Sequence, residues 1–235
     1  MSKRTKRAAK SAARVPVQDR GIKTRMALME AGKKAFAKYG YHDVIADQIA
    51  KEAGVAVGSF YAYFNNKRDL FLEVIDEITT KSADVINESL RQIFLRRSQN
   101  IEHWIRKMIV VLVDIHKESE SLLRELLRMS LYDEEARARL EQIDRLVRQL
   151  IEAALEDMVG ATRKRERESI AYVFYYAAEG VVHQMVLERG EIDEKRVIRE
   201  LSKLLAARIK DRFGVKEPRE KRGQRPREGR GADGK

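Results

Sequence analysis

Two short apolar helices on either side of a glycine, within residues 45–71, constrain the fold of this chain more than any other feature. The first is expected over residues 46–53 and the second over 57–64, with Gly54 between them. Short helices joined in this way pack at a steep angle, which requires a small residue at the crossing and a permissive backbone at the turn. Ala50 and Gly54 meet these needs, so the spacing predicts a helix-turn-helix.

The two faces of the second short helix differ in character. Phe60 and Phe64 fall on the side that meets Ile49 and Val55, which predicts a small core that fixes this helix against the first. The opposite face is short and uncharged, and it consists of Ala56, Val57, Gly58, Ser59 and Ala62. Such a face suits close entry into the major groove of DNA.

The rest of the chain shows the period of helices and lacks the alternation of apolar and polar residues that is typical of strands, so we expect an all-α fold. A first helix is expected over residues 22–39, ending at Gly40, and a fourth begins near Lys67 and ends near Lys81. Asp133 and Asp193 are expected to cap later helices. The remaining helices are predicted at about 82–96, 100–118, 120–131, 134–158, 164–188 and 194–212.

The net charge of +11 is concentrated at the two ends of the chain. Residues 1–18 carry six basic and no acidic side chains, and residues 216–235 carry eight basic and four acidic ones, which leaves +1 for everything between. All three prolines lie in or beside these ends. We therefore expect disordered basic arms at residues 1–19 and 215–235, which either bind a polyanion or only keep the protein in solution.

Composition and motifs narrow the class of protein. The chain has no cysteine, no apolar segment of membrane-spanning length and no secretory signal at its start, so we expect a cytoplasmic protein without membrane contact. It has no glycine-rich phosphate loop, HExxH or serine nucleophile motif. The four histidines, at 42, 103, 116 and 183, lack ligand spacing. Neither an enzyme nor a metal or cofactor site is expected.

The segment IAKEAGVAVGSFYAYFNNKRDLF resembles the TetR family signature, and MEAGKKAFAKYGY resembles the first helix of that family. Together they cover about 50 residues of the chain. The resemblance implies a three-helix DNA-binding head at residues 20–75 and a helical-bundle domain for ligand binding and dimerisation at 76–214. It also implies a ligand-responsive repressor that acts as a homodimer on a palindromic operator in double-stranded DNA, with a small molecule as effector.

The resemblance also implies which residues contact DNA. Val57, Gly58 and Ser59 would face the major groove, and hydroxyl groups of tyrosines together with a lysine would bind phosphates. The full expected set is Thr24, Arg25, Val57, Gly58, Ser59, Tyr61, Tyr63 and Lys67. For the tyrosines, packing is the alternative role, and for Lys67 the alternative is a solvated surface side chain.

This chain departs from the family pattern at two places. Val44 and Ile45 stand where a Thr or Ser usually caps the second helix, which leaves Asp43 as the nearest candidate cap. Val57 stands where a polar residue is common, and a valine contacts a thymine methyl group but cannot hydrogen-bond a base. We therefore expect sparse direct contacts to bases and more dependence on the shape of the DNA.

The last two helices are the expected dimer interface. Residues 164–188 are apolar around most of the helix, which predicts burial on nearly all sides. Residues 194–212 are amphipathic, with an apolar stripe formed by Val197, Leu201, Leu204, Leu205 and Ile209. Such a pair can supply half of a four-helix bundle across a two-fold axis, and the resemblance assigns the dimer to these helices.

A ligand cavity needs large apolar side chains and a few polar groups. Glu179 and His183 lie four residues apart, so they either pair with each other or meet a polar ligand. The ligand class stays open among a flat hydrophobic cation, an acyl chain and an aromatic acid. The candidate lining residues are Trp104, Met108, His116, Met129, Tyr132, Tyr172, Tyr175, Tyr176, Glu179 and His183.

Two other kinds of function remain open from the residues alone. One is a nucleoid or RNA-binding helical protein that works through its basic arms, without sequence preference and with steep salt dependence. The other is a helical adaptor that binds another protein.

Overall fold

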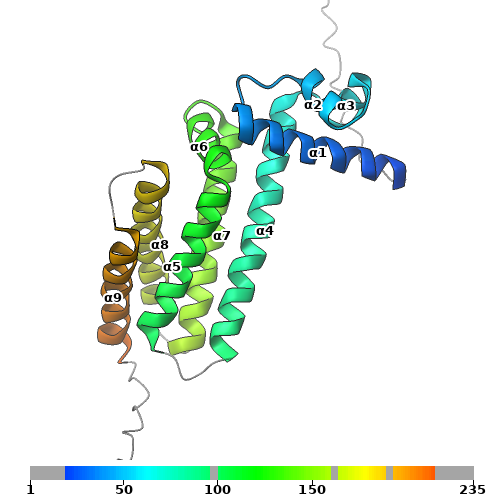
Figure 1. Cartoon of the computed structure of the whole chain (residues 1–235). Coiled ribbons are helices and arrows are strands. Elements are labelled where there is room, and N and C mark those ends of the chain that lie inside the picture. Colours follow the sequence, from blue (N-terminus) through cyan, green and yellow to red (C-terminus); the bar gives the residue numbers. More distant parts are fainter. Residues whose placement is uncertain (1–18, 96–99, 160–163, 189–192, 215–235) are drawn as a thin grey trace, which may run out of the picture.

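The computed structural model describes residues 19–95, 100–159, 164–188 and 193–214. Both predicted basic arms, apart from Asp19, lie outside the described residues. Every regular element within those ranges is an α-helix, which confirms the expected all-α fold. The helices form a small head at one end of a longer bundle (Figure 1).

The head consists of α1 (Asp19–Tyr39), α2 (Ala46–Glu52) and α3 (Val57–Tyr63). Their bounds agree with the predicted helices to within three residues. α1 ends where Gly40, with a φ of 79°, donates its N–H to the carbonyl of Phe36 at 3.0 Å. This left-handed conformation favours glycine, so the predicted stop at Gly40 is confirmed.

The body is built from α4 (Lys67–Leu95), α5 (Ile101–Glu118), α6 (Glu120–Met129), α7 (Glu134–Val159), α8 (Lys164–Leu187) and α9 (Glu194–Phe213). The short α6 lies next to the head, and the other five helices run along the length of the molecule (Figure 1). α5 contacts α4, α8 and α9, while α7 contacts α4 and α8. The predicted caps of α7 and α9 are confirmed, since Asp133 accepts from the N–H of Ala136 and Asp193 from that of Arg196.

α4 corrects the sequence-based prediction. Helices predicted to end near Lys81 and to begin again at residue 82 are one continuous helix. The junction holds no glycine or proline, and the hydroxyl groups of Thr79 and Thr80 donate to carbonyls of the preceding turn, so nothing there ends the helix. α4 therefore runs from the head through the body, and the expected domain boundary at residue 75 lies inside it.

Two clusters of buried side chains hold the fold together. The head cluster contains four fully buried phenylalanines, and the rings of Phe36 and Phe71 meet edge to face at 5.4 Å. It extends into the body, because Leu122, Leu126 and Met129 of α6 belong to it. The body cluster is formed mainly by α5, α8 and α9. Each such aromatic or leucine side chain contributes about 2–3 kcal/mol by leaving water.

Candidate nucleic-acid interface and internal cavity

The turn between α2 and α3 has the geometry that the sequence predicts. Gly54 has a φ of 68°, and the N–H of Val55 donates to the carbonyl of Ala50 at 3.0 Å. Ile49, Ala50 and Phe60 are buried where the two helices meet. α3 is therefore fixed on the head through its inner face.

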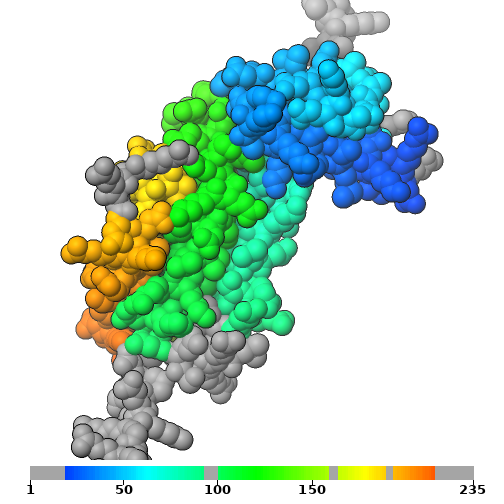
Figure 2. Space-filling model, in the orientation of Figure 1, coloured from blue at the N-terminus to red at the C-terminus, as the bar shows by residue number. Residues whose placement is uncertain are grey.

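The outer face of α3 is open to solvent at the end of the molecule (Figure 2). Val57 and Tyr61 share this face, with 41% and 57% of their surface exposed. A Cβ atom placed on Gly58 would meet nothing within 4 Å. The fold itself therefore does not require glycine at position 58. The small size of Gly58 leaves room on this face for another molecule.

Two of the other α3 candidates are less accessible. Ser59 is half-buried, and its N–H donates to the carbonyl of Ala56 at 2.8 Å in the first turn. Tyr63 is half-buried and packs against the head cluster. Of the two tyrosines in α3, Tyr61 is therefore the one that another molecule can reach more easily.

Lys67 points into the head. Its ammonium group donates to the carbonyls of Tyr41 at 2.8 Å, His42 at 3.0 Å and Val44 at 2.8 Å. Burial lowers the pKa of this lysine, and the ammonium also lies 4.6 Å from the centre of the Tyr41 ring. All three of its protons are engaged, so a phosphate contact would require it to give up one of these carbonyls.

The N-terminal half of α1 lies beside α3 and α4. The guanidinium of Arg25 contacts the carboxylate of Glu73 and lies 5.3 Å from the centre of the Phe64 ring. The hydroxyl of Thr24 donates to the carbonyl of Arg20 at 3.0 Å. Thr24 and Arg25, both expected to contact the DNA backbone, are thus partly exposed, and each already bonds to another residue of the protein.

The start of α2 corrects a second prediction. Its N-cap is Ile45, which is 60% exposed and supplies no side-chain cap, so Asp43 does not cap this helix. The chain between residues 41 and 44 is instead held from the other side by Lys67. The first N–H groups of α2 therefore donate no hydrogen bond to the side chain of the N-cap residue.

Two apolar cavities of about 90 Å³ each lie inside the body. Ile86, Leu112 and Val147 line both, so the two spaces adjoin. The first extends toward the head, and Leu122 and Leu126 of α6 form part of its wall. The only ionisable residues in its wall are His116 and Glu179, apart from the phenol of Tyr175.

The predicted ligand-binding residues divide into two groups. Trp104 and Met108 line the second cavity, while His116, Tyr175 and Glu179 line the first. His183 lines neither cavity and lies next to Glu179. The other four residues expected to bind a ligand also line neither cavity, and they are Met129, Tyr132, Tyr172 and Tyr176.

Those four side chains lie in three different environments. Met129 is buried in the head cluster, and Tyr132 is 66% exposed just after α6. Tyr172 and Tyr176 lie on the outer side of α8, with ring centres 4.6 Å apart. α8 is therefore not buried on nearly all sides within one chain, and the uncovered stripe carries these rings together with Val173.

Sequence reasoning missed most of the apolar lining. Ile75, Ile78 and Ile86 of α4 and Val147 of α7 line the cavities. Their helical spacing indicates only an inward face, because the same pattern serves a filled core and a hollow one. The cavity results from the way several helices pack together, and the spacing of residues within one helix does not predict that packing.

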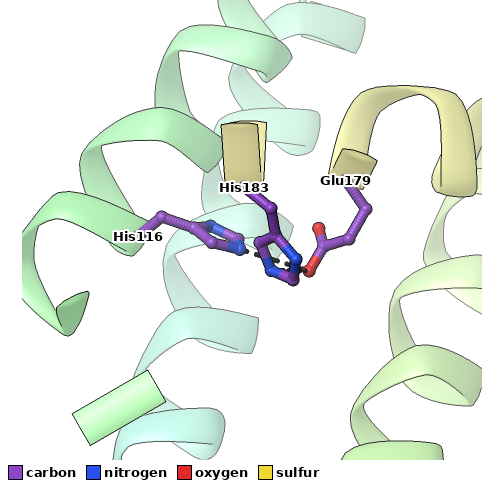
Figure 3. Close-up of side chains that lie close together, drawn as sticks. All are labelled: His116, Glu179 and His183. Carbon is purple, nitrogen blue, oxygen red and sulfur yellow. Dashed lines mark hydrogen bonds and ion pairs between the residues drawn. The ribbon is translucent and has the colours of Figure 1, made fainter. Parts of the chain in front are cut away.

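One polar cluster lies at the wall of the first cavity (Figure 3). Nε2 of His116 is 3.2 Å from Oε1 of Glu179, and Nε2 of His183 is 3.0 Å from the same oxygen. Burial alone would raise the pKa of Glu179, but the two imidazoles lower it to about 2. Burial would likewise lower the pKa of His116, yet Glu179 outweighs it and raises that pKa.

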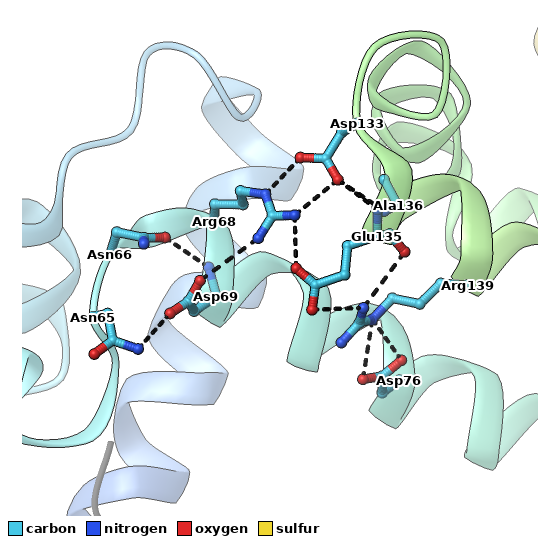
Figure 4. Close-up of polar contacts among 9 residues, drawn as sticks. All are labelled: Asn65, Asn66, Arg68, Asp69, Asp76, Asp133, Glu135, Ala136 and Arg139. Atoms are coloured by element: carbon cyan, nitrogen blue, oxygen red, sulfur yellow. Dashed lines mark hydrogen bonds and ion pairs between the residues drawn. The ribbon is translucent and has the colours of Figure 1, made fainter. Parts of the chain in front are cut away.

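A second polar network joins the head to the body (Figure 4). Arg68, in the first turn of α4, donates to Asp133 at 2.8 Å and forms an ion pair with Glu135 at 2.7 Å. Arg139 of α7 pairs with Asp76, about two turns further along α4. The guanidinium of Arg68 holds the pKa of Asp133 well below its usual range. These contacts tie the starts of α4 and α7 together.

Two family models match the chain. The model of the tetR family of bacterial regulatory proteins matches residues 28–74, and that of the tetracycline-repressor-like C-terminal domain matches residues 100–207. Together they cover about two thirds of the sequence. No helix in the described part of the chain has the length and apolarity needed to span a membrane.

Individual relatives agree with the family models. The fatty acid metabolism regulator protein of Bacillus subtilis is 33% identical over 67 residues, which cover 28% of this chain and 34% of that protein. The HTH-type transcriptional repressor AcnR of Corynebacterium glutamicum is 25% identical over 75 residues, which cover 32% of this chain and 40% of that protein. The match thus spans less than half of either relative.

A solved structure extends the likeness to the whole fold. The fatty acid degradation regulator FadR of Bacillus halodurans superposes with a TM-score of 0.59 at 19% identity, over 78% of this chain and 94% of that one. At this identity the likeness concerns the fold alone. With both family models matched in the expected order, the chain belongs to the tetR family of bacterial regulatory proteins, which are DNA-binding transcriptional regulators rather than enzymes.

Proposed function

We propose that this chain is a ligand-responsive repressor that binds a palindromic DNA operator as a homodimer. The observation that carries the proposal is the open, uncharged outer face of α3, held on a closely packed head. A helix of this kind fits the major groove, which is about 12 Å wide. The relative from Corynebacterium glutamicum is named as a repressor, which supports repression rather than activation of transcription.

Within this proposal the DNA contacts divide by accessibility. Val57, Gly58 and Tyr61 meet the groove and its phosphate edge directly, because their face of α3 is exposed. Thr24, Ser59 and Tyr63 are secondary contacts, since each is half-buried. Arg25 and Lys67 act mainly by holding the head in shape, because Arg25 pairs with Glu73 and all three protons of Lys67 are donated within the protein.

A second copy of the chain is proposed to cover the outer side of α8 and α9. Tyr172, Val173 and Tyr176 form an exposed stripe on α8, and Leu204 of α9 is 67% exposed. A two-fold axis through these helices gives a four-helix interface and places two heads on one side, which suits two half-sites of a palindrome. Val173→Glu should convert a dimer to a monomer in light scattering. Lys34→Glu, which changes an exposed side chain of α1 in the head, should leave the dimer intact.

The proposed effector carries an acyl chain. The two adjoining cavities are lined mainly by aliphatic and aromatic side chains, and the charged and hydroxyl-bearing side chains border only the first of them. An extended chain with one polar end matches this division better than a flat cation or an aromatic acid. The Bacillus subtilis relative is named as a regulator of fatty acid metabolism and the superposed Bacillus halodurans protein as a regulator of fatty acid degradation, which supports the same class of ligand.

Coupling between cavity and head is proposed to pass through shared side chains. Ile75, Leu122 and Leu126 belong to the head cluster and also line the first cavity. A ligand that fills this cavity presses on residues that set the angle between the head and α4. It then favours a state in which two heads no longer match successive grooves, which requires only different affinities for two states.

The proposal divides the chain into a head at residues 20–75 and a body at 76–214, acting in the cytoplasm. Selection of bound fragments from genomic DNA by the full chain tests it. We expect a shared palindrome with half-sites about one helical turn apart, or a multiple of that spacing, and release on adding an acyl-chain ligand. Fragments with no common sequence, retained only at low salt, would instead identify a non-specific polyanion binder.

A further inference from the structure

Three side chains with metal-binding atoms converge between α5 and α8 (Figure 3), and two of them, His116 and Glu179, line the first cavity. His116 belongs to α5, while Glu179 and His183 lie one turn apart on α8. One nitrogen from each histidine and one carboxylate oxygen lie within 4.8 Å of one another. The group is largely enclosed, since the three side chains are 8%, 17% and 26% exposed.

The hydrogen bond of His116 fixes where its proton lies. Nδ1 is 2.8 Å from the carbonyl of Leu112, which can only accept, so Nδ1 carries a proton. In a neutral ring, Nε2 then has a lone pair, and this lone pair faces Oε1 of Glu179 at 3.2 Å. Two acceptors at this distance repel each other unless a second proton or a cation lies between them.

Two other atoms of the group are not satisfied by the protein. Oε2 of Glu179 is buried and has no hydrogen-bond partner among the described residues. Nε2 of His183 is also buried and, although 3.0 Å from Oε1, makes no hydrogen bond with it. Buried polar atoms without a protein partner are uncommon, and a bound ion is one of the recognised causes.

We propose that His116, Glu179 and His183 bind a divalent transition-metal ion of the zinc class. Two imidazoles and one carboxylate are a ligand set that Zn²⁺ uses, at distances of about 2.0–2.2 Å. Tetrahedral ligands at that distance lie roughly 3.3 Å apart, close to the 3.2 Å and 3.0 Å found here. The bond from Nδ1 of His116 to the Leu112 carbonyl is the kind of outer contact that orients a metal-bound histidine.

The site leaves a coordination position for a ligand from the cavity. Three protein ligands leave a fourth position around Zn²⁺, and His116 and Glu179 both line the first cavity. The ion with two neutral imidazoles and one carboxylate carries a net charge of +1 in an apolar wall. It would hold an anionic head group there, while the metal site itself does not depend on the proposed DNA binding.

Titration of the tag-free, metal-stripped full chain with Co²⁺ tests the proposal directly. We expect one equivalent to bind with the strong visible absorption of four-coordinate Co²⁺, and Zn²⁺ to displace it. His183→Ala should weaken binding by at least about 100-fold, because even an outer contact is worth 10–100-fold. His103→Ala, which changes an exposed histidine on the same helix as His116, should bind as the unchanged protein does.

Glu179→Gln guards against loss of folding, since it keeps the shape of the side chain while removing its charge. It should retain a helical spectrum and cooperative unfolding, lose the Co²⁺ absorption, and show no rise in Tm with Zn²⁺. Absence of Co²⁺ binding by the unchanged chain would overturn the proposal. It would mean that a second proton on His116, rather than a metal ion, lies between Nε2 and Glu179. Equal binding by His183→Ala and His103→Ala would also overturn it, by identifying adventitious surface binding.

Discussion

The head and the body of this chain use their apolar residues differently. Phe36, Phe60, Phe64 and Phe71 of the head region are fully buried. The body encloses two cavities and holds buried polar atoms without hydrogen-bond partners, such as Oε2 of Glu179. The difference teaches that the head, which is proposed to enter a fixed groove, is set by close packing, whereas the body, which is proposed to bind a ligand, keeps empty space and unsatisfied polar groups.

The same substitution in each region should give the largest contrast. Phe60→Ala removes a fully buried ring that lies 5.7 Å from the ring of Phe64, so we expect a loss of about 4 kcal/mol in the free energy of unfolding. Phe174→Ala should cost less, by about 1 kcal/mol or more, because this ring already borders the second cavity. Urea denaturation measures both losses in the free energy of unfolding. Equal losses would contradict the difference in packing between the head and the body.

The contact between the two regions gives the next effect. Asp133→Asn should lower the free energy of unfolding at neutral pH by about 2 kcal/mol, because it removes the charge that Arg68 binds. The carboxylate of Asp133 has its pKa lowered by Arg68 in the fold, so its stabilisation is present above the unfolded pKa near 3.8 and is lost as pH falls below that value.

Denaturation at several pH values separates this charge from the helix cap. The unchanged protein should lose stability below about pH 4 more steeply than Asp133→Asn. The asparagine oxygen can still accept from the N–H groups of Glu135 and Ala136. Parallel pH profiles for the two proteins would show that Arg68 does not link head and body in the way described.

Adding atoms should give the smallest contrast. A Cβ on Gly32 would lie 2.6 Å from Cδ2 of Leu70, which is fully buried, so Gly32→Ala should destabilise by about 1 kcal/mol despite its better helix propensity. Ala83→Leu adds atoms at the first cavity and should leave stability unchanged or raise it by about 1 kcal/mol. Thermal unfolding compares them, and destabilisation by both would mean that the cavity has no room to fill.

The same contrast explains what the sequence could predict. The head was predictable because its signals are local: Ala50 at the crossing, and Gly40 and Gly54 where the backbone turns left-handed. The caps at Asp133 and Asp193 were predictable for the same reason. The break expected near Lys81 was wrong because the junction contains no residue that disrupts a helix.

The body was predictable only as a set of helices. Tyr172 and Tyr176 were expected to face a cavity, because a helix that is apolar nearly all round does not reveal which side meets its own chain. His116 and His183 are 67 residues apart in the sequence, so their meeting at Glu179 depends on how α5 packs against α8. Separations of this size carry no spacing signal.

The affinity of Gly58→Leu for the selected operator tests the central claim most directly. Since a Cβ there meets nothing within 4 Å, the variant should fold and dimerise as the unchanged chain does. The added side chain would occupy the space needed by DNA, so fluorescence anisotropy should show at least about tenfold weaker binding, with Gly58→Ala in between. Undiminished affinity in a folded Gly58→Leu dimer would contradict the claim that the outer face of α3 enters the groove.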